Sequence, residues 1–303
     1  MKKLLTVIFL FCFSIIHAQI ITAKVIDSSN NRPLGFAIVL YHSKQKVVYT
    51  DIGGYFRLPA DSLMSNDSLT VQFIGFQKLT IAAKEIKDSM LINMLPEIQS
   101  LEPVIVSNCR KTEEYMLNKK RGRIRQYIGP GPETKLVIMS RYDNVSGRKG
   151  YITKLSILID EKAPNMQVPV RLRWYEWNVD THKPGKELTD TSILVYPYQQ
   201  GWNDFELPAK TIPCPKDWLV FGLEFIYTPE YQKQFDSLKS STEKIQWLSD
   251  MQNRWSLSMQ YVNDEDDSGF YMVNNGDITR YAKKYDRYFI RPALRFTVEV
   301  CKE

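Results

Sequence analysis

Short segments of alternating apolar and polar residues, separated by turn residues, are the dominant pattern along the chain. This alternation is typical of β-strands with one face toward a core, because successive side chains point to opposite sides of a strand. The clearest turn is Asp51-Ile52-Gly53-Gly54, between the apolar segments 37–41 and 69–76. Glycine permits a positive φ there. We expect Tyr55 and Phe56 to begin the next strand, with one ring on each face.

The pattern over residues 19–95 predicts a small β-sandwich of about seven strands. Four blocks in this segment carry a more specific signal: Lys24-Val25-Ile26-Asp27, Pro33-Leu34-Gly35-Phe36-Ala37-Ile38-Val39, Thr50-Asp51-Ile52-Gly53-Gly54-Tyr55-Phe56 and Phe73-Ile74-Gly75-Phe76. Together they resemble the carboxypeptidase-regulatory-like domain, which is a transthyretin-like β-sandwich. The resemblance implies an accessory module, often found at the N-terminus of secreted and outer-membrane proteins, including TonB-dependent receptors.

The family name does not imply peptidase activity for this chain. Metallocarboxypeptidases bind zinc through histidine and glutamate. Beyond the N-terminal leader the chain has only two histidines, His42 and His182, and neither has zinc-ligand spacing. We therefore expect no catalytic zinc site in this module.

Residues 96–134 are predicted to be a linker. The apolar stretch 101–107 resembles the segment that follows this module in such receptors and pairs with an energy-coupling protein; a last edge strand or a tether is the alternative. Thr112, followed by two glutamates and then five cations in 119–125, predicts a short basic helix whose ends match the helix dipole. The cations would suit an anionic membrane surface or an acidic polysaccharide, and nucleic acid is not an expected partner.

Residues 135–303 are predicted to form a second sandwich, which is jelly-roll-like. Its expected strands are 136–139, 152–159, 168–177, 192–198, 202–207, 218–227, 257–262 and 288–300, and helical apolar spacing predicts an insertion at about 230–254. Segments 171–176, 183–185, 201–202 and 218–224 resemble galactose-binding-like β-sandwiches of bacterial surface proteins. The expected fold class is all-β: a transthyretin-like sandwich, then a jelly-roll-like sandwich with a helical insertion.

The N-terminal residues predict export. Lys2 and Lys3, an apolar run to Ile16, and Ala18 together predict a signal peptide at 1–18 that is too short to span a bilayer. The formal net charge of +6 falls to +4 without the two lysines. We expect a protein of the periplasm, outer membrane or cell surface, either soluble or peripherally bound to a membrane. Three cysteines remain, Cys109, Cys214 and Cys301; a Cys214–Cys301 disulfide and three thiols are both open.

Two groups of residues are candidate ligand sites. The first is a set of aromatic residues that could stack against sugar rings, although large rings also serve as core: Tyr175, Trp177, Tyr196, Tyr198 and Trp202. The second is Asp264, Asp266 and Ser268 before Gly269, whose alternating oxygens suit a structural calcium ion. Asn275 stands where an EF-hand would have its bidentate glutamate, so an acidic hairpin tip is the alternative.

The sequence favours a non-catalytic protein. No Ser-His-Asp set is credible with so few histidines. Glu176 and Glu224 lie on predicted strands, and a glycosidase would need such carboxylates side by side. We expect an exported binding or assembly protein of the Gram-negative cell envelope, without a cofactor, whose partner is an envelope protein or a glycan. A hydrolase acting on polysaccharide is the alternative.

Overall fold

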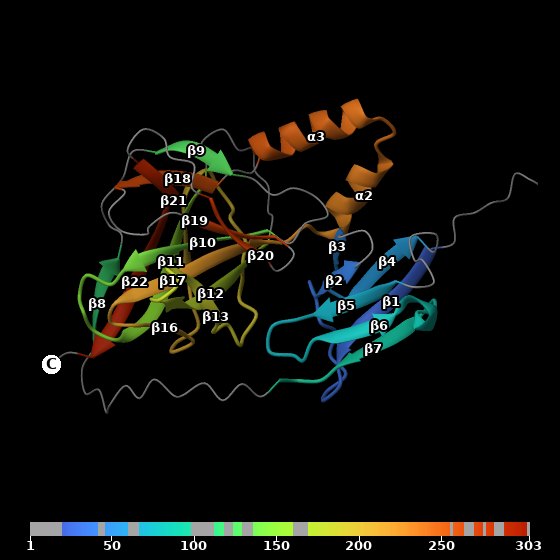
Figure 1. Ribbon diagram of the computed structural model, residues 1–303, viewed down its shortest axis with the longest axis horizontal. Helices are drawn as coiled ribbons and strands as arrows, with labels where there is room; N and C mark the ends of the chain where they lie inside the picture. Colours follow the sequence, from blue (N-terminus) through green and yellow to red (C-terminus); the bar gives the residue numbers. More distant parts are fainter. Residues whose placement is uncertain are drawn as a thin grey trace, which may run out of the picture.

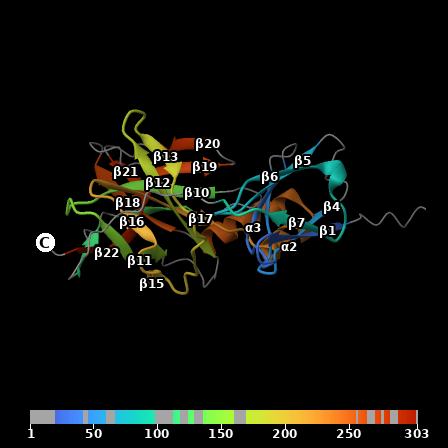
Figure 2. The same cartoon turned by 90° about the horizontal axis from the view of Figure 1, so that it is seen from below.

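The computed structural model describes residues 20–41, 46–59, 67–97, 112–117, 124–128, 136–159, 169–254, 257–263, 270–274, 277–281 and 288–301. The described strands form four sheets, grouped into two sandwiches that lie side by side, as Figures 1 and 2 show from two directions. Within these residues the α-helices are α2 (Pro229–Ser237) and α3 (Ser241–Arg254). The predicted all-β class is confirmed.

The N-terminal sandwich has seven strands, as the pattern predicts. A three-stranded sheet, β4-β1-β7, packs on a four-stranded sheet, β3-β2-β5-β6, over one apolar core. The core includes Val25, Phe56 and Ile92 from the first sheet and Val39 and Val71 from the second. The strands are β1 (Ile20–Asp27), β2 (Ile38–Tyr41), β3 (Lys46–Tyr49), β4 (Tyr55–Pro59), β5 (Ser68–Gln72), β6 (Leu79–Ala82) and β7 (Met90–Met94).

The Asp51–Gly54 turn behaves as its sequence predicts. Gly54 has φ +80°, and a Cβ there would lie 2.5 Å from the Val25 carbonyl oxygen. The Gly54 carbonyl accepts a hydrogen bond from the Val25 amide at 2.8 Å. Asp51 Oδ1 accepts one from the Tyr55 amide at 2.9 Å. The Tyr55 ring is then exposed and that of Phe56 is buried, so the turn determines which face each ring occupies.

The C-terminal sandwich has two larger sheets that enclose a second apolar core. One sheet runs β13-β12-β17-β10-β19-β20, with β14 on β12; the other runs β21-β18-β11-β22-β8, with β15 and β16 on β11 and β9 on β18. The strands are β8 (Thr112–Leu117), β9 (Ile124–Ile128), β10 (Leu136–Asp143), β11 (Gly150–Ile159), β12 (Val170–Asn178), β13 (Lys183–Glu187), β14 (Leu194–Val195), β15 (Gly201–Glu206), β16 (Ile212–Cys214), β17 (Trp218–Phe225), β18 (Leu257–Asn263), β19 (Phe270–Asn274), β20 (Asp277–Tyr281), β21 (Tyr288–Pro292) and β22 (Leu294–Cys301).

The predicted basic helix after Thr112 is wrong, because this segment is strand β8. It pairs with β22 from Thr112↔Cys301 to Leu117↔Phe296, and Leu117 is fully buried in the second core. A helix-start signal contributes little stability in so short a segment. Pairing at an open sheet edge instead satisfies the backbone hydrogen bonds and buries the Leu117 side chain. The second sandwich therefore includes residues upstream of the expected boundary at 135. Residues 118–123 lie outside the described residues.

Other predicted elements differ mainly in extent. The expected strand 288–300 is two strands divided at Ala293, and 192–198 contains only the two-residue strand β14. The helical insertion is present as α2 and α3. Ile245, one of its apolar positions, is exposed, whereas the Trp247 ring packs at the junction between the two sandwiches.

The junction is itself an apolar cluster, which we call the seam. It consists of Phe36, Ile38, Val47 and Tyr49 from the N-terminal sandwich and Ile226 and Tyr227 from the C-terminal one, and all six are buried. The sheet β3-β2-β5-β6 is therefore covered on both faces, by its own partner sheet and by the second sandwich. This double cover places charged residues of the second sandwich out of water.

Candidate functional site

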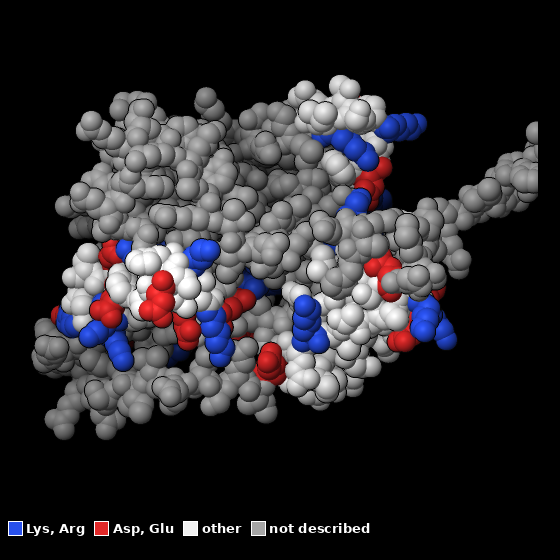
Figure 3. All heavy atoms as spheres, in the orientation of Figure 1, with Lys and Arg blue, Asp and Glu red and all other residues white. Residues whose placement is uncertain are grey.

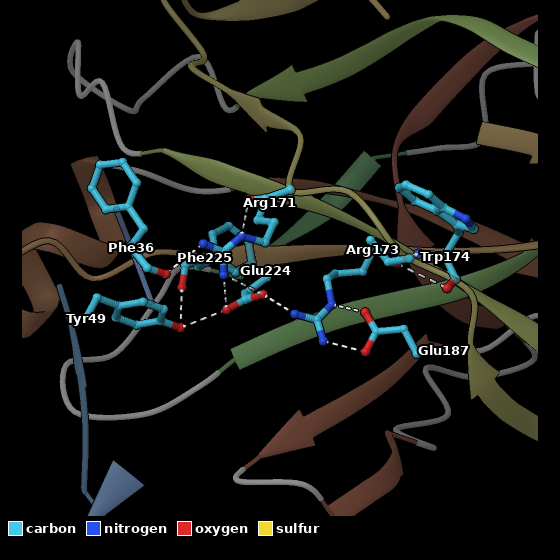
Figure 4. A network of polar contacts seen from close by, with 10 residues as sticks. Phe36, Tyr49, Arg171, Arg173, Trp174, Glu187, Glu224 and Phe225 are labelled. Atoms are coloured by element: carbon cyan, nitrogen blue, oxygen red, sulfur yellow. Dashed lines mark hydrogen bonds and ion pairs between the residues drawn. The ribbon is translucent and has the colours of Figure 1, made fainter. Parts of the chain in front are cut away.

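A buried network of charged side chains lies beside the seam. Arg171 and Arg173 alternate on the outer face of β12, and Arg171 is in register with Glu224 on the neighbouring strand β17. Because side chains of paired residues lie on the same face of a sheet, this register brings the two arginines to one carboxylate. Figure 4 shows Glu224 between them. Arg171 and Glu224 are both fully buried.

Each arginine is held by several acceptors. Arg171 Nη1 lies 3.3 Å from Glu224 Oε1, and its Nε donates to Ser192 Oγ at 3.0 Å. Arg173 Nη1 donates to Glu224 Oε2 at 2.6 Å. The other side of the Arg173 guanidinium forms an ion pair with Glu187, a half-buried residue of β13. Two guanidinium groups and two carboxylates therefore balance one another.

The N-terminal sandwich contributes two groups to this network. Arg171 Nη2 donates to the Phe36 carbonyl oxygen at 2.7 Å. The Tyr49 hydroxyl lies 3.3 Å from both Glu224 Oε1 and the Phe225 carbonyl oxygen, to which it can donate. Burial, and then the Glu224 charge, raise the pKa of Tyr49 well above its ordinary value, so the hydroxyl keeps its proton. Directional bonds thus join the two sandwiches beside the apolar seam.

The network constrains the chemistry of Glu224. A carboxylate with no exposed surface is costly unless it is paired and hydrogen-bonded, and both Glu224 oxygens face arginines. Glu176 on β12 is exposed instead. The two carboxylates considered for a hydrolase therefore do not face a common solvent cleft, and Glu224 has a structural environment.

A turn of the N-terminal sandwich approaches the second sandwich closely. Gly75, between β5 and β6, has φ +79°, and a Cβ there would lie 2.7 Å from the Asp190 carbonyl oxygen. The Arg171 guanidinium carbon lies 5.4 Å from the centre of the Phe73 ring, close enough for cation–π attraction. Phe73 in turn meets Phe76 edge-on at 5.6 Å. The motif 73–76 is therefore an interdomain contact.

A hollow of about 270 Å³, the seam pocket, opens between this turn and the second sandwich. Arg173 and Thr189 are at its buried base, whereas Lys78 and Glu97 are exposed at its rim. Further lining residues from both sandwiches are Ile38, Gln72, Phe73, Ile74, Gly75, Phe76 and Glu187. The pocket therefore exists only where the two sandwiches meet.

A second hollow of about 520 Å³ lies beside the Asp51–Gly54 turn. Its lining is more apolar and includes Ile52, Tyr196 and Tyr231, together with the carboxylates of Asp51 and Glu230. Ile52 is 77% exposed and Tyr196 is 42% exposed. Of the predicted sugar-stacking residues, Tyr196 is the one that lines this hollow.

The structure does not gather the five predicted aromatic residues into one platform. Tyr175 is buried, and the half-buried Trp177 packs against the same cluster on the outer face of the β12 sheet. Tyr198 is exposed and meets Phe205 edge-on. Trp202 is on β15, in the other sheet, under the Arg295 guanidinium at 3.8 Å.

The remaining candidates are placed only in part. Asp264, Asp266 and Ser268 lie outside the described residues, and within the described part of the chain no cluster of His, Cys, Asp and Glu suits a metal ion. Cys214 is buried in the second core, near Asn144 Nδ2 at 3.6 Å, while the side chains of Cys109 and Cys301 are not described. Among described residues, no helix has the length and apolar character needed to cross a membrane. Figure 3 shows cations and carboxylates interspersed on the described part of one face.

Comparison with known families identifies the first sandwich. Residues 21–106 match the family model of the CarboxypepD_reg-like domain. The N-terminal sandwich is a carboxypeptidase-regulatory-like domain. This regulatory-like domain therefore supplies Phe36, Tyr49 and the 73–76 turn to the junction, and its match extends past the expected boundary at 95.

Other comparisons are less informative. No curated protein matches the sequence. A solved structure, the cysteine protease and lectin-like domains of Cwp84, a surface layer associated protein of Clostridium difficile, aligns at 9% identity with a TM-score of 0.34. The alignment covers 88% of this chain but only 59% of that one. A TM-score this low does not establish a shared fold, so the regulatory-like domain is the identified part of the chain.

Sequence reasoning missed the charged network, although one signal was visible. Glu224 is the only charged residue in the otherwise apolar run 218–226, and a carboxylate in a buried strand needs a cation nearby. Arg171 and Arg173 alternate within the expected strand 168–177, so the sequence places both on one face. Their partners Phe36 and Tyr49 are far away in the sequence, and no local pattern connects them.

Proposed function

We propose that the chain is an exported, non-catalytic binding or assembly protein of the cell envelope, in which the regulatory-like domain holds the C-terminal sandwich in a fixed orientation. The observation that carries the proposal is the bonding of Phe36 and Tyr49 to Arg171 and Glu224 across the junction. Such bonds, next to an apolar seam, are what a positioning role requires.

The identified family supports a binding or accessory role for the N-terminal part. The chemistry of the network also supports a non-catalytic protein, because Glu224, the most enclosed carboxylate described, is neutralised by two arginines. A hydrolase would need a carboxylate that reaches water and substrate. The proposed partner is an envelope glycan or an envelope protein, and the proposed compartment is the periplasm, outer membrane or cell surface.

Four measurements test the proposal. Mass spectrometry of the protein from cell envelopes should find Gln19 or a neighbour as the first residue, and an intact Met1 there would contradict export. Purified residues 19–303 on an array of bacterial glycans, and cross-linking in cells, should identify a glycan or an envelope protein. Release of reducing ends from a bound polysaccharide would contradict the non-catalytic assignment and favour the hydrolase.

Fixed orientation is tested separately in the full chain. Spin labels on the exposed residues Lys84 and Lys186, one in each sandwich, should give a single narrow distance distribution. Glu224→Gln should broaden it, whereas Glu176→Gln, which changes an exposed glutamate on the neighbouring strand, should not. A broad distribution in the unaltered chain would contradict the positioning role.

A further inference from the structure

Three polar side chains that line the seam pocket have no partner in the part of the chain that the structure describes. Within the described residues, Gln72, Lys78 and Glu97 form no side-chain hydrogen bond or ion pair, yet all three line this pocket. Each comes from the regulatory-like domain. Opposite them, Glu187 uses its carboxylate on Arg173 but stays 30% exposed. The pocket therefore brings an amide, an ammonium group and carboxylates to the lining of one open hollow.

The charges of the pocket indicate a neutral ligand. Lys78 and Arg173 are balanced by Glu97 and Glu187, and Arg173 is already occupied by Glu187 and Glu224. An anion would meet two carboxylates, and a cation would meet Lys78. A ligand whose groups both donate and accept hydrogen bonds uses this mixture best, because carboxylates only accept, ammonium only donates and an amide does both.

The aromatic lining adds an apolar requirement. Phe73 and Phe76 are half-buried beside these polar groups, and their rings meet edge-on at an interplanar angle of 64° rather than stacking on each other. A face of such a ring attracts the slightly positive C–H groups of a ligand. The volume of about 270 Å³ is just below the usual range of ligand pockets, which begins at about 300 Å³, so only a small ligand fits. Hydroxyl groups around a compact ring with an apolar face describe a sugar.

We propose that the seam pocket binds one neutral sugar residue, either as a free monosaccharide or as the terminal unit of a glycan. This inference rests on the proposed binding function and moves the sugar site from the predicted aromatic residues of the C-terminal sandwich to the junction. Glu97, Glu187 and Gln72 accept hydrogen bonds from hydroxyl groups, Lys78 donates one, and Phe73 or Phe76 contacts the apolar face of the ring.

The test uses the full chain and saturation-transfer NMR, followed by calorimetry. The probes are galactose, glucose, mannose and N-acetylglucosamine, each free and as the terminal unit of an oligosaccharide, with glucosamine and galacturonate as charged analogues. We expect a neutral sugar to bind and its charged analogue to bind more weakly. Binding of the free sugar alone would indicate a monosaccharide ligand. Binding of the oligosaccharide as well would indicate that the terminal unit of a glycan is also accepted.

Variants locate the site. Glu97→Gln and Gln72→Leu should each weaken binding about three- to tenfold, the effect of one hydrogen bond. Glu97→Trp should block the rim. Glu85→Gln is the matched control, because Glu85 is exposed in the same domain but does not line the pocket. Unchanged melting curves would show that the variants fold.

Three results would overturn the inference. They are the absence of binding for every sugar, binding that is unchanged in all three pocket variants, and binding that is lost in Tyr196→Ala instead. The last result would place the sugar in the second hollow and leave the proposed function intact. Capture of an envelope protein without any sugar binding would also leave that function intact, whereas hydrolysis of a polysaccharide would contradict the function itself.

Discussion

The two faces of strands β12 and β17 are both buried, but in opposite ways. On the inner face, Leu172, Trp174 and Leu223 join an apolar core. On the outer face, Arg171 and Glu224 have no exposed surface either, yet they are charged and bonded to the other sandwich. The same backbone thus carries an intradomain core and an interdomain contact, one residue apart.

This difference shows that a charged side chain on the outer face of a sheet need not be exposed to solvent when a second domain covers that face. Apolar burial is non-directional and tolerates small shifts, whereas the bonds from Arg171 to Phe36 and Glu224 require particular atoms at particular positions. Substitutions on the inner face and substitutions on the outer face should therefore have different consequences. The inner face determines whether the second sandwich folds, and the outer face determines how it is joined to the first.

The largest effect is expected from Glu224→Gln. Removing the charge leaves the buried Arg171 with neutral acceptors such as Ser192 and the Phe36 carbonyl, and breaking a buried ion pair from one side costs about 3–5 kcal/mol. Urea unfolding of the full chain measures this cost. Glu176→Gln, on the exposed part of β12, should change the free energy of unfolding by no more than about 0.5 kcal/mol. Equal effects would show that burial of Glu224 does not matter.

Removing both charges should be much less harmful than removing one. In the double variant Arg171→Met and Glu224→Leu, Arg173 keeps its partner Glu187, so no buried charge is left alone. Apolar replacement of a buried ion pair is often neutral or stabilising, although the Phe36 carbonyl loses its donor, at about 1–3 kcal/mol. We expect greater stability than in Glu224→Gln but a broader interdomain distance distribution. A double variant less stable than the single one would contradict this account.

The turns give a comparison of intradomain and interdomain strain. Gly54→Val forces a β-branched residue to φ +80° and places its Cβ against the Val25 carbonyl, so unfolding free energy should fall by about 1–2 kcal/mol or more. Gly53→Val should cost less, because Gly53 has no positive φ. Gly75→Ala should instead separate the sandwiches, since its Cβ meets Asp190. Chemical melts and the spin-label distances distinguish the cases.

The smallest effect is expected from Tyr49→Phe, with a pH dependence. Loss of the hydroxyl should cost about 1 kcal/mol at pH 7. Because the folded-state pKa of Tyr49 is raised above the unfolded value, its stabilising contribution is full below about pH 10 and is lost as pH rises further. Between pH 8 and pH 10.5 the unaltered chain should lose on the order of 1 kcal/mol more stability than Tyr49→Phe. Equal decreases of the unfolding free energy in the unaltered chain and in Tyr49→Phe would show that the pKa of Tyr49 is not raised by folding.

Local features of the sequence predicted much of the fold. The Asp51–Gly54 turn, the seven strands before residue 95 and the helical insertion depend on nearby residues, and they were predictable for that reason. The strand β8 was not, because its hydrogen bonds go to β22 at the other end of the chain. Whether such a segment begins a helix or forms an edge strand depends on tertiary contacts with residues far away in the sequence.

The candidate site was less predictable for a similar reason. Alternation within the expected strand 168–177 places Arg171, Arg173 and Tyr175 on one face, but the sequence contains no sign that a second domain covers that face. Pairing of Tyr49 with Glu224 joins residues 175 positions apart. The aromatic residues were chosen by type, and Tyr175 shows the weakness of that choice, since it is buried among Val137, Met139 and Val220.

The bonds from Arg171 and Tyr49 across the junction also affect the entropy of binding. A pocket with walls on two independently moving bodies binds only in the fraction of time when the walls are correctly placed, and its apparent affinity falls by that fraction. Bonds that hold the bodies together before a ligand arrives remove this loss, because the ordering occurs during folding. Weak hydrogen bonds between a small ligand and Gln72, Lys78 and Glu97 can then suffice.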